Sequence, residues 1–411
     1  MAGRYWVETL GCPKNSVDSE KLVGTLVADG LREADSPADA DVVVVNTCAF
    51  VEAARQESVD TVLALHEARR PGARLVVTGC LAERYGADLA DALPEADLVA
   101  GFGVPVTMGR RDVARLDLLN LPRPPARAPW AYVKVAEGCD RACGFCAIPS
   151  FRGRQRSRSP EAILGEVDAL GAAEIVLVAQ DLASYGRDIG QPGLIEQLVS
   201  TVAERVPRVR LLYLYPSELD DGLVDAICAT GVPYFDLSLQ HVSRPLLRRM
   251  RRWGDGDRFL ARIRAIRARE PEATFRSSFI VGYPGETEDD HDRLLDFLVE
   301  AQLDWAGFFP FSREEGTYAA GLDGTVDEHL VAERLRELSE LQDGITAGRR
   351  AALIGSTVEV LVDEPGVGRS HREAPEIDGV VSLPADLTVG SFAAVTVTGA
   401  AGPDLEAEAA W

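Results

Sequence analysis

Three short apolar segments near the N-terminus run almost directly into cysteines. The segments and the cysteines that follow them are Tyr5–Leu10 before Cys12, Val42–Asn46 before Cys48 and Leu75–Thr78 before Cys80. Their apolar, β-branched composition predicts buried strands. The stretches between them predict helices at Asp18–Asp29, Val51–Ala68 and Leu81–Ala92. Because alternating strands and helices form a parallel sheet whose strands end at one edge, we expect the three cysteines to converge there.

Three converging thiols indicate more than packing. A lone cysteine after a strand is usually a small core residue. Three cysteines at equivalent strand ends are better explained as ligands of one site, and we assign this role to Cys12, Cys48 and Cys80. Three thiolates on a four-iron cluster leave one iron without a protein ligand, so we expect a reactive site rather than a structural one.

A second trio has a compact local spacing. Cys139, Cys143 and Cys146 stand in the segment EGCDRACGFCAIP, with no fourth ligand nearby. This spacing also leaves one iron of a four-iron cluster open to a substrate or cofactor. The alternative of a structural zinc site would need four ligands, commonly two C-x2-C pairs or close histidines. The alternative of a disulfide framework is disfavoured because the seven cysteines are an odd number in a large chain.

The N-terminal residues bear on the compartment. The first residues lack the basic region and the long apolar region of a signal peptide. The longest strand-like apolar stretch near them, Val42–Val45, is far shorter than a membrane span. We therefore expect a cytoplasmic protein with reduced thiols and no contact with a membrane.

Strand and helix patterns resume after a proline-rich connector. Four of the nine residues in Leu121–Pro129 are proline, which favours a linker. Strands are then predicted at Ala131–Ala136, Glu174–Val178, Arg210–Leu214, Tyr234–Leu237, Phe275–Val281 and Asp304–Phe309. Six βα units predict a partial parallel barrel with its active site at the carboxyl ends of the strands, where the second cysteine trio falls. A long amphipathic helix at Asp327–Ala352 closes this unit.

The C-terminal part changes to short strands among glycine and proline turns. Strands predicted at Thr357–Val362, Val380–Ser382 and Phe392–Thr398 indicate a small all-β barrel. The expected fold class is therefore α/β with three units. We place a parallel α/β cluster domain at residues 1–118, a linker at 119–129, the partial barrel at 130–352 and the small β-barrel at 353–411.

The net charge of the chain is −22, and the C-terminal unit contributes strongly to it. From residue 353 onward, ten acidic side chains face only two basic ones, Arg369 and Arg372. A module that binds nucleic acid needs Lys and Arg to neutralise phosphates. An acidic module instead favours a basic protein partner, although acidic surfaces also serve solubility alone.

The C-x3-C-x2-C motif of the second trio is the signature of radical S-adenosylmethionine (SAM) enzymes, which this chain resembles. The resemblance implies that SAM chelates the open iron and is cleaved by one electron to methionine and a deoxyadenosyl radical. Phe145 matches the apolar residue that the family carries between the last two cysteines. With the first trio ahead and a small barrel behind, essentially the whole chain resembles the methylthiotransferases, whose last domain is called TRAM.

The resemblance to methylthiotransferases also implies a division of labour. The cluster on the second trio generates the radical that abstracts a hydrogen atom, the cluster on the first trio carries the sulfur, and a second SAM supplies the methyl group. The expected cofactors are two 4Fe-4S clusters and SAM, with no catalytic residue beyond the cluster ligands. Candidates for SAM contacts by position are Phe145, Gln180, Gly282 and Gly285, although glycines in such loops are commonly turn residues.

Two branches of this family compete. The MiaB-type branch modifies isopentenyl-adenosine in tRNA, and the RimO-type branch modifies the β-carbon of an aspartate in ribosomal protein twelve of the small subunit. The stretches similar to the RimO-type branch are Leu10–Glu20, Ala179–Asp181, Tyr185–Gly186, Leu239–His241, Val281–Thr287 and Ala374–Gly379. Together with the acidic C-terminal unit they favour the ribosomal protein, and tRNA is the alternative substrate.

The resemblance implies partners as well. We expect a basic ribosomal protein as substrate, free or on the ribosome, a reductant such as flavodoxin or ferredoxin, and a sulfur donor. A metal-stabilised ribosome-binding module without catalysis is the alternative from a different functional class.

Other charged and polar residues are expected in simpler roles. Four alternating arginines would share one face of a strand, for salt bridges, a phosphate or RNA contact, or a role near the SAM carboxylate: Arg152, Arg154, Arg156 and Arg158. A second group is expected on a solvated helix face: Arg248, Arg249, Arg251 and Arg252. His241 is expected to be a hydrogen-bonded structural histidine, and Cys228 a core residue.

Overall fold

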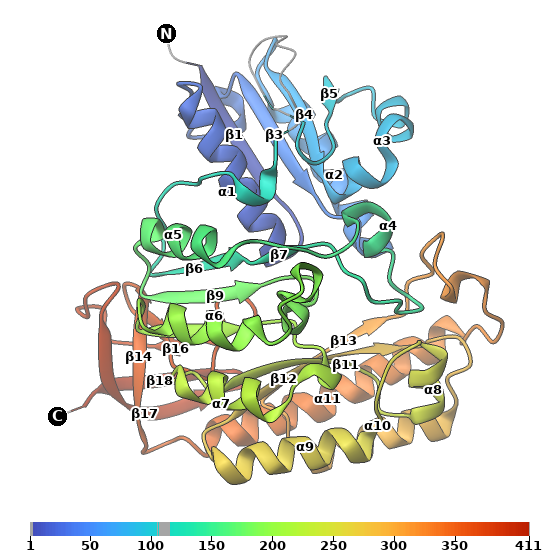
Figure 1. Ribbon diagram of the computed structural model, residues 1–411, viewed down its shortest axis with the longest axis vertical. Helices are drawn as coiled ribbons and strands as arrows, with labels where there is room; N and C mark the ends of the chain where they lie inside the picture. The colour runs from blue at the N-terminus through green and yellow to red at the C-terminus, as the bar shows by residue number, and fades with distance from the viewer. Residues whose placement is uncertain (1–2, 105, 107–115, 411) are drawn as a thin grey trace.

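The computed structural model describes residues 3–104, 106 and 116–410. The N-terminal sheet lies at one end of the molecule, the central strands lie in the middle, and the C-terminal β-barrel lies beside them (Figure 1). None of the helices in these ranges is long and apolar enough to cross a membrane.

The N-terminal unit is a parallel sheet in the order β2-β1-β3-β4-β5. Its strands are β1 (Arg4–Thr9), β2 (Arg32–Glu33), β3 (Val42–Thr47), β4 (Arg74–Gly79) and β5 (Leu98–Val99). Its helices are α1 (Pro13–Ala28), α2 (Glu52–Ala68) and α3 (Cys80–Ala92). The valine run of β3 is fully buried because α1 packs on one face of the sheet and α2 and α3 pack on the other. The predicted parallel α/β fold is confirmed here.

The central unit contains the six predicted strands, but they form two parallel sheets instead of one. The orders are β10-β9-β6 and β11-β12-β13, with a bridge between Leu214 and Leu237. The strands are β6 (Trp130–Lys134), β9 (Glu174–Val178), β10 (Arg208–Leu211), β11 (Tyr234–Gln240), β12 (Thr274–Val281) and β13 (Trp305–Pro310). The division lies at Tyr213, which has a φ of +66° and donates its N–H to the Asp236 carboxylate, away from the ladder.

Helices cover the outside of these strands and enclose the largest apolar core. They are α5 (Pro160–Leu170), α6 (Leu194–Ala203), α7 (Asp221–Ala229), α8 (Arg244–Arg249), α9 (Gly256–Arg269), α10 (Glu288–Ala301) and α11 (Glu328–Ala351). The last of them leads directly into the C-terminal unit, as predicted.

The C-terminal unit is a closed barrel in the order β14-β15-β16-β18-β17. Its strands are β14 (Thr357–Glu364), β15 (Val367–Arg369), β16 (Val381–Ser382), β17 (Phe392–Ala401) and β18 (Asp404–Ala409). The sequence reasoning missed two of them. Strand β15 is very short, and β18 places only Leu405 and Ala407 in the core between acidic residues of low strand propensity.

One apolar cluster contains side chains from all three units. Val17 of α1 and Ala374 of the C-terminal unit meet inward-facing residues of the central strands, among them Tyr132 and Tyr234. Ile377 packs against the same cluster. The stretch Ala374–Gly379 therefore packs against the inner side of the central strands. Through this cluster the central unit is attached to the N-terminal and the C-terminal units.

Candidate functional site

The first cysteine trio gathers at one edge of the N-terminal sheet. Cys12 follows β1, Cys48 follows β3 and Cys80 begins α3 directly after β4, and these three strands are neighbours. The loop at Gly11 comes so close that a Cβ atom there would lie 2.8 Å from the Cys48 Cβ atom. With a φ of +93°, this position needs glycine for its backbone conformation as well.

Burial and nearby charges shift the pKa values of the three thiols in different directions. Burial would raise the pKa of the Cys12 thiol, but the positive charges of Lys14 and Arg152 outweigh it and lower that pKa below its usual range. Burial raises the pKa of Cys48 to about 11 and also raises that of Cys80, and the charges of the other thiols add to both shifts. Each cysteine thus lies within electrostatic range of the other two.

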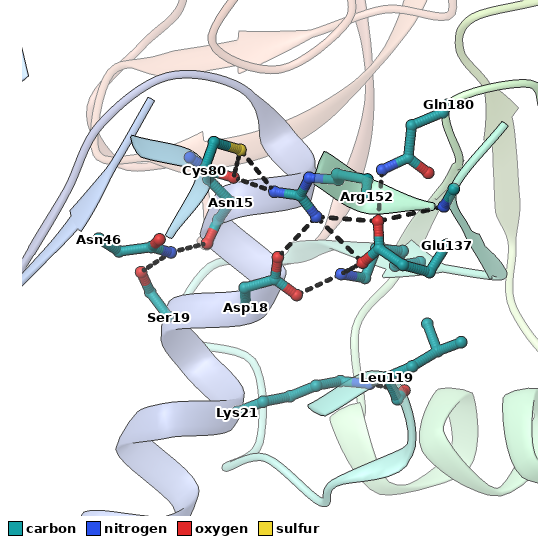
Figure 2. Close-up of polar contacts among 12 residues, drawn as sticks. Asn15, Asp18, Ser19, Lys21, Asn46, Cys80, Leu119, Glu137, Arg152 and Gln180 are labelled. Atoms are coloured by element: carbon teal, nitrogen blue, oxygen red, sulfur yellow. Dashed lines mark hydrogen bonds and ion pairs between the residues drawn. The ribbon is translucent and has the colours of Figure 1, made fainter. Parts of the chain in front are cut away.

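Arg152 connects the two cysteine regions. It ends α4 (Ile148–Arg152), which follows the second trio closely in the chain. Its Nη2 atom donates hydrogen bonds to the Cys80 Sγ atom at 3.0 Å and to the Asn15 Oδ1 atom at 2.6 Å. Figure 2 shows the guanidinium between the sulfur and the carboxylates on its other side. A residue of the central unit therefore contacts a ligand candidate of the N-terminal unit.

Buried charges surround the Arg152 guanidinium. Its Nη1 atom donates to Asp18 at 3.1 Å and to Glu137 at 3.0 Å. Lys134 donates to the same two carboxylates, and the Gln180 amide donates to Glu137 at 2.6 Å (Figure 2). Two cations thus face two carboxylates, which compensates the cost of burying each charge. The network holds α1 of the N-terminal unit against β6 and the loop of the second trio.

The four alternating arginines do not share one face, so that prediction is wrong, but each of them forms a salt bridge, as expected. Gly153 has a φ of +75° and turns the chain, and only Arg156 belongs to a strand, β8 (Arg156–Ser157). Arg152 and Arg158 are buried, whereas the other two are exposed. The turn separates positions that an unbroken strand would have placed together.

The second trio lies in the loop after β7 (Ala136–Glu137). Burial raises the pKa of Cys139 to about 11 and that of Cys146 to about 12. The backbone N–H of Arg141 donates to the Cys139 sulfur at 3.4 Å, and Arg252 Nη1 donates to the Cys143 sulfur at 3.4 Å. Two of the three sulfur atoms therefore already accept N–H donors.

Of the four arginines expected on a solvated helix face, only Arg248 is exposed in the helix, α8. The helix ends at Arg249, whose guanidinium donates to two backbone carbonyls. Beyond it, Arg251 has a φ of +55°, which directs Arg252 back to the cysteine loop. Arg252 and Arg141 both lie over the Tyr215 ring, with guanidinium carbons 4.1 and 4.0 Å from its centroid.

The arrangement of both trios can be compared with known metal sites. Within the described ranges, no three His, Cys, Asp or Glu side chains are close enough to hold a single metal ion. A tetrahedral zinc site brings its thiolate sulfurs to about 3.8 Å from one another. A four-iron cluster binds each thiolate to a different iron and needs a wider arrangement. Each trio offers three thiols and no fourth protein ligand within the described ranges, a donor set that suits a four-iron cluster with one open iron better than a tetrahedral zinc site.

The four residues expected by position to contact SAM lie in different surroundings. Phe145 is partly buried against the central core. Gly282 and Gly285 have φ values of +80° and +86°, and a Cβ at Gly282 would lie 2.4 Å from a methyl group of Val331 in α11. Turn geometry and packing alone therefore explain both glycines. The buried Gln180 Oε1 atom has no described hydrogen-bond partner and leaves one acceptor beside the cysteine loop. SAM contacts stay a prediction for all four.

Lys14 is a candidate that the sequence reasoning missed. Its side chain is only 8% exposed, and its Nζ atom lies 3.3 Å from the centroid of the Tyr213 ring. Burial lowers the pKa of this amine. The available signal was its position two residues after Cys12, at the start of a helix whose following residues are mostly buried.

Two expected structural roles are confirmed. His241 is fully buried, its Nδ1 atom accepts the backbone N–H of Ser243, and burial lowers its pKa to about 4. Cys228 is partly buried and packs against the central core.

The exposed surface of the C-terminal barrel is even more acidic than its composition indicates. Both of its basic side chains are buried: Arg369 pairs with Glu174 and Asp363, and Arg372 pairs with Glu272. Every exposed charged side chain in residues 353–410 is acidic, namely Glu359, Glu364, Glu376, Asp386, Glu406 and Glu408. This surface would repel phosphates and attract a basic protein.

Comparisons with known proteins agree with the three units. Residues 4–101 match the family described as Uncharacterized protein family UPF0004, residues 133–298 match the Radical SAM superfamily, and residues 354–410 match the TRAM domain. A protein of Nocardioides sp. named ribosomal protein uS12 methylthiotransferase RimO is 44% identical, over 97% of this chain and 95% of its own length. A protein of the same name from Saccharopolyspora erythraea is 45% identical, over 92% of this chain and 88% of its own length.

A solved structure supports the fold alone. The radical SAM methyltransferase TsrM from Kitasatospora setae, with cobalamin and a [4Fe-4S] cluster bound, superimposes with a TM-score of 0.52 at 13% identity. The match covers 95% of this chain and 84% of the TsrM chain.

Proposed function

The chain belongs to the RimO-type radical SAM methylthiotransferases, and we propose from this premise that it places a methylthio group on the β-carbon of an aspartate in ribosomal protein uS12. Relatives that carry the uS12 methylthiotransferase name match at 42–45% identity over nearly the whole chain. The predicted family is thereby confirmed, and the enzyme is a radical SAM methylthiotransferase.

The observation that carries the proposal is the pair of cysteine trios, with buried Arg152 between the first trio and the helix that follows the second. In the proposal, one trio holds the 4Fe-4S cluster that binds SAM and supplies a carbon radical, and the other holds the 4Fe-4S cluster that supplies sulfur. The ligands would be Cys139, Cys143 and Cys146 for the first and Cys12, Cys48 and Cys80 for the second. The methyl group would come from a second SAM.

The protein's own residues would position these groups. Arg152 holds the Cys80 sulfur against the central unit, and Arg252 donates to the Cys143 sulfur. Both N–H donors stabilise negative charge on sulfur. The apolar cluster around Tyr132, Val17 and Ile377 excludes water from the inside of the central strands. A radical site needs this exclusion, because it prevents side reactions with solvent.

The partners follow from the same premise. The substrate would be a basic ribosomal protein, which the acidic C-terminal surface would attract, either free or on the ribosome. An electron donor such as flavodoxin or ferredoxin and a sulfur donor would be required. A ribosomal substrate also supports the proposal of a cytoplasmic enzyme.

Separate incubations with the two candidate substrates test the proposal against the tRNA alternative. Reconstituted wild-type protein would be incubated anaerobically with SAM, reductant and either uS12 or tRNA, and both products analysed by mass spectrometry. We expect one hydrogen replaced by one methylthio group on the uS12 aspartate and none on tRNA. Modification of tRNA alone would overturn the assignment. Failure to release deoxyadenosine from SAM would favour a non-catalytic binding module.

A further inference from the structure

Lys14 is a buried cation without a carboxylate partner among the residues that the structure describes. Its Nζ atom makes a cation–π contact with Tyr213, and within the described ranges it forms no hydrogen bond or salt bridge; the strongest charge influence on it is the Cys12 thiol. The other two lysines in the chain do have carboxylate partners. Lys134 pairs with Asp18 and Glu137, and Lys21 pairs with Glu166.

A buried ammonium group without an acceptor is costly, because it loses its hydration and gains little in return. The face of an aromatic ring replaces only part of the lost hydration. The nearest carboxylate that influences it, Asp236, already accepts the Tyr213 N–H at 2.9 Å and lies 3.5 Å from Arg276. The N–H donors of Lys14 are therefore available to an anionic group that arrives from outside the chain.

The position of Lys14 limits where that anion would lie. The residue is two positions after Cys12, and its charge lies close enough to affect the Cys12 thiol. Tyr213, which supports the ammonium, follows β10 at the carboxyl ends of the central strands, the edge where this kind of barrel binds its ligands. Lys14 thus stands between the first trio and the catalytic edge of the central unit.

Arg152 does not offer the same opportunity, although it is equally close. Its Nη2 atom donates to Asn15 and Cys80, and its Nη1 atom donates to Asp18 and Glu137. A carboxylate would have to displace one of these buried partners to reach it. The arrangement therefore distinguishes Lys14 as the cation with unused donors next to the first trio.

We infer that Lys14 binds the side-chain carboxylate of the substrate residue and so fixes the adjacent carbon beside the Cys12, Cys48 and Cys80 site. This inference rests on the proposed function, in which the reacting carbon is one bond away from a carboxylate. The ammonium donates hydrogen bonds to the carboxylate oxygens, and no covalent bond to Lys14 forms or breaks. An adenine base offers no anionic group at the corresponding place, so Lys14 would contribute to selection of a protein substrate.

Lys14 is thus a positioning residue that acts on binding and orientation. The Tyr213 ring holds the ammonium in place, with the Nζ atom 3.3 Å from the ring centroid. A methionine at this position would keep the length and the apolar contact with the ring but remove the charge. An arginine would keep the charge and the hydrogen-bonding capacity.

The test is a double-mutant cycle between enzyme and substrate. Anaerobically reconstituted wild type, Lys14→Met and Lys14→Arg would be titrated with uS12 carrying its aspartate or an asparagine in its place, and Kd measured by calorimetry. We expect wild type to bind the aspartate form at least about tenfold more tightly than the asparagine form. Lys14→Met should reduce this preference to under about twofold, and Lys14→Arg should retain most of it.

The wild-type measurements alone can overturn the inference, even if the methionine variant fails to incorporate iron. Equal affinity of wild type for the aspartate and asparagine forms would do so, as would an unchanged preference in a Lys14→Met protein with full iron content. Lys14→Gln provides a second neutral variant, with the same expected loss. Methylthiolation by wild type is measured in parallel. Unmodified uS12 would show that the proposed function fails. Modified uS12 with no energetic coupling between Lys14 and the substrate aspartate would show that this inference alone fails.

Discussion

The Arg152 guanidinium donates a hydrogen bond to the Cys80 sulfur atom at 3.0 Å, although the two residues belong to different units of the chain. The contact joins the helix that follows the second cysteine trio to a ligand candidate of the first. Because the same guanidinium is held by Asp18 and Glu137, its position is fixed from both sides. This buried side chain therefore contributes to the relative placement of the two proposed cluster sites, together with the Lys134–Asp18 ion pair and the apolar cluster shared by the three units.

Replacing Arg152 by glutamine should destabilise the protein by about 3 kcal/mol. Asp18 and Glu137 would then share Lys134 as their only buried cation in the network of Figure 2. The midpoint of urea unfolding, monitored by circular dichroism, measures the change. Arg154→Gln is the matched control, because the Arg154 side chain is 91% exposed, and it should shift stability by less than about 0.5 kcal/mol. Equal midpoints for the two variants would contradict the structural role of Arg152.

Replacing Arg252 by leucine should make the reduction potential of the radical-generating cluster more negative. The variant loses the N–H donor to the Cys143 sulfur, and such donors stabilise the more negative, reduced state of a cluster. A redox titration followed by electron paramagnetic resonance measures the potential. Arg264→Leu removes an exposed arginine on α9 and should leave the potential unchanged. A positive shift in the Arg252 variant would rule out this assignment.

His241 should make stability depend on pH between about pH 4 and 6.5. In the unfolded chain the imidazole takes up a proton near pH 6.5, whereas native His241 stays neutral until its pKa of about 4. Burial of the imidazole lowers its pKa most. The charge of Asp290 raises this pKa, whereas those of His291 and Arg334 lower it further. The unfolded state therefore binds the extra proton in this window, so stability falls as pH is lowered, by up to about 1.4 kcal/mol per unit.

His241→Asn should flatten this dependence. The asparagine side chain keeps an acceptor for the Ser243 N–H but does not titrate. Unfolding free energies of both proteins at pH 7, 6 and 5 give the two slopes. Identical slopes would show that His241 does not carry the effect.

Replacing Asp378 by alanine should release the stretch Ala374–Gly379 from the central unit. Asp378 accepts hydrogen bonds from the Tyr234 hydroxyl at 2.6 Å and the Ala374 N–H at 2.9 Å, and it pairs with Arg276. Loss of this buried carboxylate should cost about 3 kcal/mol. Limited proteolysis should then cut the stretch, while Asp386→Ala, at an exposed position, should resist as wild type does. Equal resistance of both variants would argue against the anchoring role.

Elements with strong local patterns were predictable from the sequence. The valine run of β3 and the long helix α11 coincide closely with their predicted ranges, because burial on both faces and helical periodicity are properties of the local sequence. The fold class followed from their order. The division of the six central strands into two sheets did not, because it depends on the positive φ of Tyr213 and its bond to Asp236, a residue distant in sequence.

The convergence of the first cysteine trio was predictable from the sequence. The strand ends brought Cys12, Cys48 and Cys80 to one edge, as parallel topology requires. Lys14 was not identified in advance, and Arg152 was expected on a strand face instead of beside Cys80, because both act through contacts with distant parts of the chain. A single sequence shows the type of a charged residue but not which partner, if any, it meets after folding.

The central claim is that two separate three-thiolate sites hold two clusters, and anaerobic quantitation of iron and sulfide on three proteins tests it most directly. Wild type should hold about eight irons per chain, and Cys12→Ala and Cys139→Ala should each keep about half, with the electron paramagnetic resonance signal of the other centre intact. Loss of all iron in either variant, or no loss in both, would contradict two independent sites.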